Sequence, residues 1–207
     1  MWRNLCKVTL TASKFHRSLR RKIVNNEFIR CLFEEKDLST IPAIAHGQRF
    51  EDAARTDYLE SKRMAGHGDL QVRCCGLLLH PSYKYIGASP DGQVYDPSSS
   101  GHSHGLLEIK CPHTPYLQDL TPEEACDLTG FCAKLVNGRP ELQENHAYYF
   151  QIQGQLGISG LKWCDFVIWT GPQHLSVERI HFNEDFWAEV LLPALLQFYA
   201  KHIKESM

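Results

Sequence analysis

The chain has 207 residues, of which 43% are hydrophobic and 22% are charged, and its formal net charge is −2. This is the composition of an ordinary globular domain. No apolar stretch reaches the roughly 18 residues needed to span a bilayer, and the first residues lack the apolar core of a secretory signal. We therefore expect a soluble intracellular protein without membrane contact, with the choice between nucleus and cytoplasm left open.

Charge is distributed unevenly along the chain. Residues 1–22 contain seven basic and no acidic side chains, whereas the other 185 residues carry 15 basic and 24 acidic ones. A basic segment attached to an acidic body indicates a local anion-binding site. A solvated or targeting-like N-terminal helix is the alternative explanation of the same pattern.

The hydrophobic pattern predicts helices first, then a group of strands, and then a mixture of both. The expected helices lie at residues 11–22, 24–35, 43–62, 122–136, 143–157 and 184–204. Extended segments are expected at residues 71–80, 84–89, 92–95, 106–111, 163–170 and 174–182. Thr11 or Ser13 could cap the first helix, residues 96–105 are expected to form a mobile loop, and Pro193 is expected to bend the last helix.

This order of elements predicts an α/β fold in which a central mixed β-sheet is flanked by helices. No internal repeat or domain linker is visible, so we expect a single domain over residues 1–207. Its expected parts are a basic helical arm at 1–35, a core at 43–182 and a C-terminal helix at 184–204.

Two short motifs carry candidate chemistry. Asp91 lies between Pro90 and Gly92 in a turn that can aim its carboxylate at the next strand. On that strand the period of two places Glu108 and Lys110 on the same face. Two carboxylates can hold a hard divalent cation, and an ammonium group can organise a water beside it. Phosphodiester hydrolysis needs this chemistry.

Two expected helices add polar side chains on defined faces. Glu51 shares a helical stripe with small and aromatic residues, so it is either a paired core group or a ligand. In the helix expected at 143–157, Tyr148, Gln151 and Gln155 lie on one face. Gln151 is either a functional group or a buried amide satisfied by the backbone.

Five segments in order resemble motifs of the PD-(D/E)xK nuclease superfamily and, within it, the lambda-exonuclease or YqaJ-type viral recombinase family. They lie at residues 8–13, 47–51, 87–92, 107–112 and 148–153, and they are similar in that order to the family's ITAS, GxxxE, SPDG, EIKCP and YxxQxQ motifs. The resemblance covers roughly residues 8–170 and implies a restriction-endonuclease-like core.

The resemblance also implies roles for individual residues. Asp91, Glu108 and the backbone carbonyl of Ile109 would bind Mg²⁺ or Mn²⁺, and Glu51 would complete the acidic cluster directly or through water. Lys110 would orient the attacking water or help to deprotonate it. One cation is the minimum that the motif implies, and a second is compatible with it.

Further residues are implied to support the reaction. Gln151 would position Lys110 or the water, and Ser13, Thr11 and Ser89 would hold a DNA phosphate. The family tends to place an arginine shortly before its ITAS segment, where it contacts the terminal phosphate. Here Lys7 or Arg3 is the candidate for that contact, but a lysine cannot form the planar two-point contact of an arginine.

The expected activity is exonucleolytic digestion of linear double-stranded DNA in recombination or repair. The favoured direction is 5′ to 3′, which leaves a single strand as product. An endonuclease or flap nuclease with the same site is an alternative, and so is a catalytically silent DNA-binding domain of the same fold. A homo-oligomer is compatible with the family, but no interface can be read from this sequence.

Overall fold

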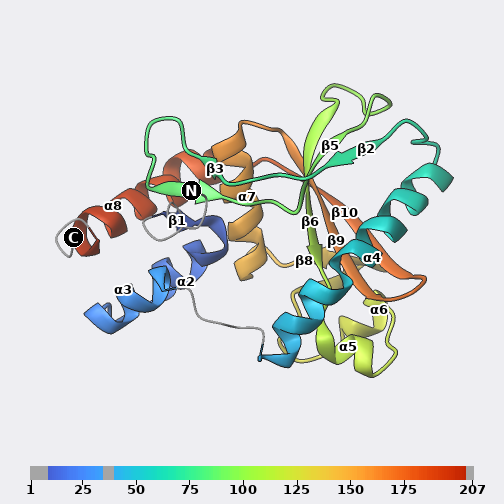
Figure 1. Cartoon of the computed structure of the whole chain (residues 1–207), viewed down its shortest axis with the longest axis horizontal. Coiled ribbons are helices and arrows are strands. Elements are labelled where there is room, and N and C mark those ends of the chain that lie inside the picture. The colour runs from blue at the N-terminus through green and yellow to red at the C-terminus, as the bar shows by residue number, and fades with distance from the viewer. Residues whose placement is uncertain (1–8, 35–39, 204–207) are drawn as a thin grey trace.

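The computed structural model describes residues 9–34 and 40–203 (Figure 1). Its largest described sheet has the strand order β10-β9-β6-β5-β2. The strands are β2 (Gln71–Arg73), β5 (Gly92–Tyr95), β6 (His104–Lys110), β9 (Trp163–Gly171) and β10 (His174–His181). The β6–β9 pair is parallel and the other pairs are antiparallel. This confirms the predicted mixed sheet.

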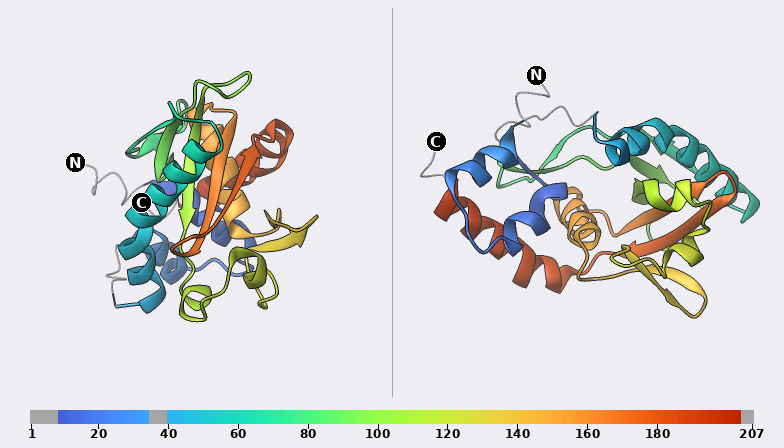
Figure 2. Two further views of the ribbon diagram at one scale, coloured as in Figure 1. Left: turned by 90° about the vertical axis from the view of Figure 1, so that its right-hand side faces the viewer. Right: turned by 90° about the horizontal axis from the view of Figure 1, so that it is seen from below.

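Two helices, α4 (Pro42–Met64) and α7 (Ala147–Ser159), cover opposite faces of this sheet (Figure 2). Helix α4 begins at a proline. The N–H groups of a first helical turn have no partner within the helix, so a proline, which lacks this group, is well suited to that position. Helix α7 is capped by the ring of His146 and ends at Gly160, which has the left-handed φ of 75°. Because both faces are covered, every residue of β9 is buried.

The alternation of side chains along β6 decides which helix each one meets. Leu107 and Ile109 belong to the apolar cluster beneath α4. Leu106 belongs to the cluster beneath α7, and Glu108 and Lys110 share its face of the strand. The charged pair therefore points toward α7, and the predicted division of this strand into two faces is confirmed.

A smaller sheet with the order β1-β4-β3 lies beside the first, and helices cover it (Figure 1). Its strands are β1 (Leu10–Thr11), β3 (Leu78–Leu79) and β4 (Ile86–Ala88). The surrounding helices are η1 (Ala12–Lys14), α2 (Phe15–Arg20), α3 (Asn26–Phe33), the π-helix η2 (Phe186–Leu191) and α8 (Leu192–His202). The chain passes directly from β4 into β5 through Ser89, Pro90 and Asp91, so this turn joins the two sheets.

The predicted helix at 122–136 is wrong for most of its length. Helix α5 (His113–Leu117) and the short helix α6 (Pro122–Ala125) are followed by an antiparallel hairpin of β7 (Ala133–Val136) and β8 (Arg139–Leu142). Its turn contains Asn137 and Gly138, both with positive φ, 50° and 77°. Asn-Gly favours such tight hairpins, so this signal outweighs the helical pattern.

Other differences concern the ends of elements. The predicted strand at 71–80 is divided between β2 and β3, which belong to different sheets. The predicted helix at 11–22 starts as β1 and η1, and Thr11 makes no capping side-chain hydrogen bond. Residues 184–202 form one uninterrupted helical run, in which Pro193 lies in the first turn of α8 and directly follows the π-helix η2. No helix within the described ranges is long and apolar enough to cross a membrane.

We expect Gly154→Ala to lower the free energy of unfolding by about 1–3 kcal/mol, because overpacking a filled core is destabilising. An added Cβ atom there would lie 2.5 Å from the ring of Phe15, which is fully buried and cannot swing away. Urea denaturation followed by tryptophan fluorescence measures the change. Gly47→Ala is the control, because its Cβ meets nothing within 4 Å, and it should stabilise α4 by about 1 kcal/mol. Equal effects of the two changes would contradict this account of the packing.

Candidate active site

Asp91 is held at the point where the pairing of β5 with β6 ends. The last pair of that ladder joins Gly92 and Leu107. Two residues further along β6, the backbone N–H of Ile109 donates to Oδ2 of Asp91 at 2.7 Å. The carboxylate thus takes the place of a strand partner, and this fixes it beside Glu108 and Lys110 as the sequence predicted.

Glu108 is a buried carboxylate whose two oxygens both accept hydrogen bonds. Its exposed fraction is 1%. Oε1 accepts from Nζ of Lys110 and from Nε2 of Gln151, each at 2.6 Å, and Oε2 accepts from Nε2 of Gln155 at 2.7 Å. A buried charge is tolerated only when it is paired and hydrogen-bonded in this way.

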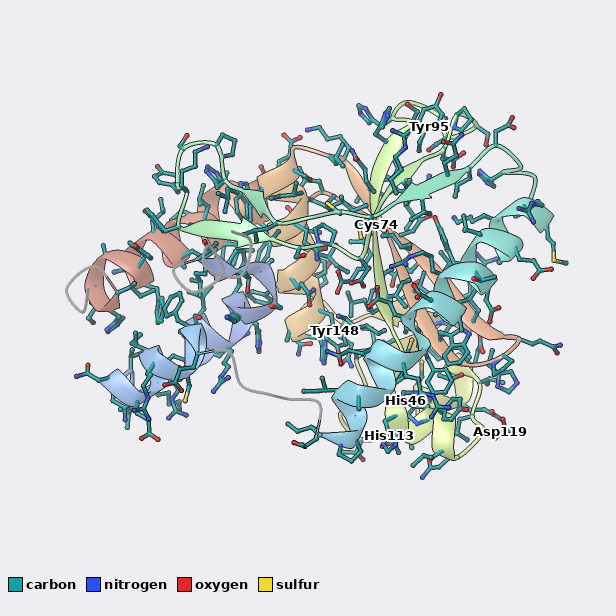
Figure 3. The ribbon with its side chains drawn as sticks, in the orientation of Figure 1. His46, Cys74, Tyr95, His113, Asp119 and Tyr148 are labelled. Carbon is teal, nitrogen blue, oxygen red and sulfur yellow. The ribbon has the colours of Figure 1, made fainter. Side chains whose placement is uncertain are left out.

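Lys110 is enclosed on a second side by an aromatic ring. Its Nζ lies 4.5 Å from the ring centroid of Tyr148, which projects from the start of α7 (Figure 3). Burial alone would lower the pKa of Lys110, but Glu108, Tyr148 and Asp91 together outweigh burial and raise that pKa. Lys110 is therefore an ammonium group at neutral pH, which favours orienting a water or stabilising negative charge over accepting a proton.

The environment of Asp91 disfavours the charged form of its side chain, whereas the environment of Lys110 favours the charged form. Burial, and then the nearby Glu108, raise the pKa of Asp91 to about 7, and Glu51 adds to the rise. The hydrogen bond from Ile109 and the charge of Lys110 offset only part of this effect. A negative charge on Asp91 is thus unfavourable until additional positive charge arrives.

A cavity of about 360 Å³ opens beside these groups. Its lining includes Glu51 from α4, Asp91 from the turn, Lys110 from β6 and Tyr148 from α7. Oε1 of Glu51 accepts from Arg55 at 2.7 Å, and the same guanidinium nitrogen donates to the backbone carbonyl of Asp91 at 3.1 Å. The structure therefore brings Glu51 to the same cavity as Asp91, through one shared arginine.

A second cavity, of about 250 Å³, is lined by three of the residues expected to hold a phosphate. Thr11, Ser13 and Ser89 line it together with Gln151 and Gln155. The hydroxyl groups of Thr11 and Ser13 lie 3.3 Å apart. Both glutamines also contact Glu108, so the second cavity adjoins the buried carboxylate. Lys7 and Arg3, the remaining candidates for the phosphate contact, lie outside the described residues.

Arg55 and the contact of Gln155 with Glu108 were not predicted from the sequence. Arg55 follows Glu51 by four residues, and Gln155 follows Gln151 by four, which places each pair on one helical face. That spacing is the signal that could have found both contacts.

The donor chemistry of the site fits a hard divalent cation, although the ligands are engaged with protein groups. Among residues 9–34 and 40–203, no three His, Cys, Asp or Glu side chains form a group that could hold a metal ion. Glu108 is bonded to Lys110 and two glutamines, and Glu51 is bonded to Arg55. The available atoms are nevertheless carboxylate oxygens, which Mg²⁺ and Mn²⁺ prefer, and burial and Glu108 make a negative charge on Asp91 unfavourable without a nearby cation.

Comparison with known sequences identifies a family. A family model described as YqaJ-like viral recombinase domain matches residues 1–162. The chain is also 27% identical over 128 residues to the uncharacterized protein R354 of Acanthamoeba polyphaga mimivirus, a match that covers 60% of this chain and 19% of R354. The chain thus spans only a small part of the length of this relative.

Solved structures share the fold. The alkaline exonuclease LHK-Exo from Laribacter hongkongensis is similar with a TM-score of 0.69 and 24% identity, over 99% of this chain and 92% of its own. The SOX protein of KSHV, solved in a complex with RNA, is similar with a TM-score of 0.61 and 13% identity, over 98% of this chain and 69% of its own. The predicted fold, a mixed sheet flanked by helices, is therefore confirmed as that of the alkaline exonucleases.

We expect the chain without divalent cations to lose stability as the pH rises, because of Asp91. Its pKa rises from an ordinary 3.8 to about 7 on folding, so the folded state binds more protons between these values. The resulting stability is fully present below about pH 4 and is lost as the pH rises through about 7. Asp91→Asn removes the charge and keeps an acceptor for the N–H of Ile109.

Asp91→Asn should therefore raise the free energy of unfolding by about 2–4 kcal/mol at pH 8 and by much less at pH 4. Urea denaturation in the presence of a chelator at both pH values measures the difference. The exposed residue Asp69 provides the control, and Asp69→Asn should change little at either pH. The same stabilisation by Asp91→Asn at both pH values would contradict the raised pKa.

Proposed function

Because the chain belongs to the YqaJ-like viral recombinase domain family, we propose that it is a metal-dependent nuclease that hydrolyses phosphodiester bonds of linear double-stranded DNA. The observation that best supports this proposal is the junction of the turn with β6. There Asp91 and Lys110 line the first cavity, and Lys110 donates to the buried Glu108 beside them. Two carboxylates and an ammonium group suit a reaction in which negative charge develops on phosphate oxygens.

In the proposed site, Asp91, Glu108 and the backbone carbonyl of Ile109 hold Mg²⁺ or Mn²⁺, and Glu51 completes the set. Such a cation makes a nearby water more acidic and stabilises negative charge on the leaving oxygen. Its positive charge would also remove the electrostatic cost that raises the pKa of Asp91. For Glu51 to take part, its contact with Arg55 must open.

Lys110 and Gln151 complete the proposed reaction site. The ammonium group of Lys110 borders the first cavity, where it orients the attacking water and stabilises charge. Gln151 shares Oε1 of Glu108 with Lys110, so it fixes the carboxylate that in turn holds the ammonium group. The leaving group departs opposite the water, and the 5′-phosphate remains on the released nucleotide.

The second cavity is the proposed phosphate site. Thr11, Ser13 and Ser89 supply hydroxyl groups there, and Lys7 is retained as a further proposed contact. Lys14 also lines this cavity, and Arg17 and Arg20 lie in the last turn of helix α2, which follows Lys14 in the chain. Because backbone phosphates supply most of the proposed contacts, binding should weaken as salt is added.

The proposed exonucleolytic action follows the likeness to alkaline exonuclease structures. LHK-Exo has also been solved with dAMP, and SOX has been solved with DNA as well as with RNA. These ligands support a nucleic-acid substrate for this chain. The 5′-to-3′ direction, the single-stranded product and assembly into a homo-oligomer remain further predictions of the proposal.

Substrate topology tests the proposed activity. With Mg²⁺ present, linear duplex DNA should be degraded to nucleotides, whereas closed circular DNA should survive because it has no end. Duplexes labelled at one strand end, with a 5′-phosphate or a 5′-hydroxyl, report direction and phosphate dependence. Cutting of the closed circle would instead support an endonuclease, and binding of DNA without any cleavage would support a silent domain.

Lys110→Met should lower the rate of cleavage by roughly 10²–10³-fold, because it removes a charge aimed at the reacting phosphate. Single-turnover measurements on the linear duplex give this rate, and circular dichroism confirms that the variant is folded. Lys84→Met is the matched control, because Lys84 is an exposed lysine and does not line the first cavity. Full activity of the Lys110 variant would remove this residue from the mechanism.

A further inference from the structure

Gln155 contacts Glu108 but has no role in the reaction proposed above. It is 1% exposed, and its Nε2 donates to Oε2 of Glu108 at 2.7 Å. The other oxygen of that carboxylate is bound by Lys110 and Gln151. Gln155 is therefore the described residue whose side chain fixes the second oxygen, and with it the rotation of the carboxylate about its last bond.

The other end of the same amide has no comparable partner. Oε1 of Gln155 is buried and accepts no hydrogen bond from any residue that the structure describes. An unpaired buried carbonyl is unfavourable, and an apolar side chain of similar size would avoid its cost. Packing alone therefore gives a poor account of a glutamine here, whereas the contact between its Nε2 and Glu108 accounts for it.

The placement of Gln155 also links the two cavities. It lines the second cavity together with Ser13 and Ser89, while Glu108 is held from the side of the first cavity by Lys110. Gln151 and Gln155 are one helical turn apart on α7. The two amide groups that donate to Glu108 therefore come from one helix.

We infer that Gln155 is a positioning residue that holds the Glu108 carboxylate in the orientation needed to bind the divalent cation. The inference rests on the proposed function. Loss of a residue that orients a metal ligand from behind typically lowers metal affinity or activity by roughly 10–100-fold. Gln155 does not touch the reacting phosphate in this role.

Gln155→Met tests this role, because methionine keeps the approximate volume and removes the donor. Calorimetric titration with Mn²⁺ alone should show affinity lower by roughly 10–100-fold than in the unaltered chain. On a linear duplex, kcat should fall by a similar factor while KM for DNA changes by less than about twofold. Gln155→Asn is the second variant, because it keeps the amide but is too short to reach Oε2, and it should behave alike.

Gln153 provides a matched control on the same helix. Its Nε2 donates to the backbone carbonyl of His181 at 3.0 Å, and its Oε1 accepts from the N–H of Asn183 at 2.9 Å. It is fully buried, and neither of these contacts involves Glu108. Gln153→Met should therefore lower thermal stability but leave the Mn²⁺ affinity and kcat of the folded protein unchanged.

The possible outcomes separate this inference from the proposed function. Mn²⁺ affinity and kcat equal to those of the unaltered chain, in both Gln155 variants, would overturn the positioning role and leave the nuclease proposal standing. A rise in KM with unchanged kcat would also overturn it, because it would indicate direct contact with DNA. An unaltered chain that neither binds Mn²⁺ nor cleaves DNA would overturn the proposed function, and the inference with it.

Discussion

The organisation of this site depends on one buried negative charge. Glu108 lies on a central strand, beneath a helix, where an isolated carboxylate would be strongly unfavourable. The fold compensates with an ammonium group two residues away and with two amide groups from α7. These three donors connect β6, α7 and the two neighbouring cavities, so the position of the helix on the sheet and the charge of the site are set together.

The turn that contains Asp91 adds a second constraint. It carries the chain from β4 in the small sheet to β5 in the large one, and its carboxylate accepts a hydrogen bond from the backbone of β6. Burial, and then the nearby carboxylate of Glu108, raise the pKa of Asp91 to about 7. A divalent cation, as proposed for this site, would offset the negative charge of these two carboxylates.

The parts of the site that lie close together in sequence could be predicted from local rules. Glu108 and Lys110 share a face because strands have a period of two, and Asp91 is aimed by the proline and glycine beside it. Gln155 was placed on the correct helical face, but its partner is 47 residues away along the chain. No local rule specifies such a contact, since it depends on how α7 packs on the sheet.

Errors in the predicted elements have similar causes. The β7–β8 hairpin was missed because the helix that starts at residues 122–125 was extended to residue 136, over the strand that precedes the Asn-Gly turn. The segment at residues 10–14 forms a short strand and a 3₁₀ turn instead of a regular helix, because Leu10 pairs with Ile86 across the smaller sheet. In each case a turn or a distant partner outweighed the local hydrophobic pattern.

Anomalous scattering from a crystal soaked in Mn²⁺ would test most directly whether Asp91 and Glu108 form a metal centre. The account predicts a strong peak bound by carboxylate oxygens of both residues, with Lys110 and Gln155 still in contact with Glu108. A peak bound by other residues, or no peak at saturating Mn²⁺ in a crystal whose solvent channels reach the first cavity, would contradict it.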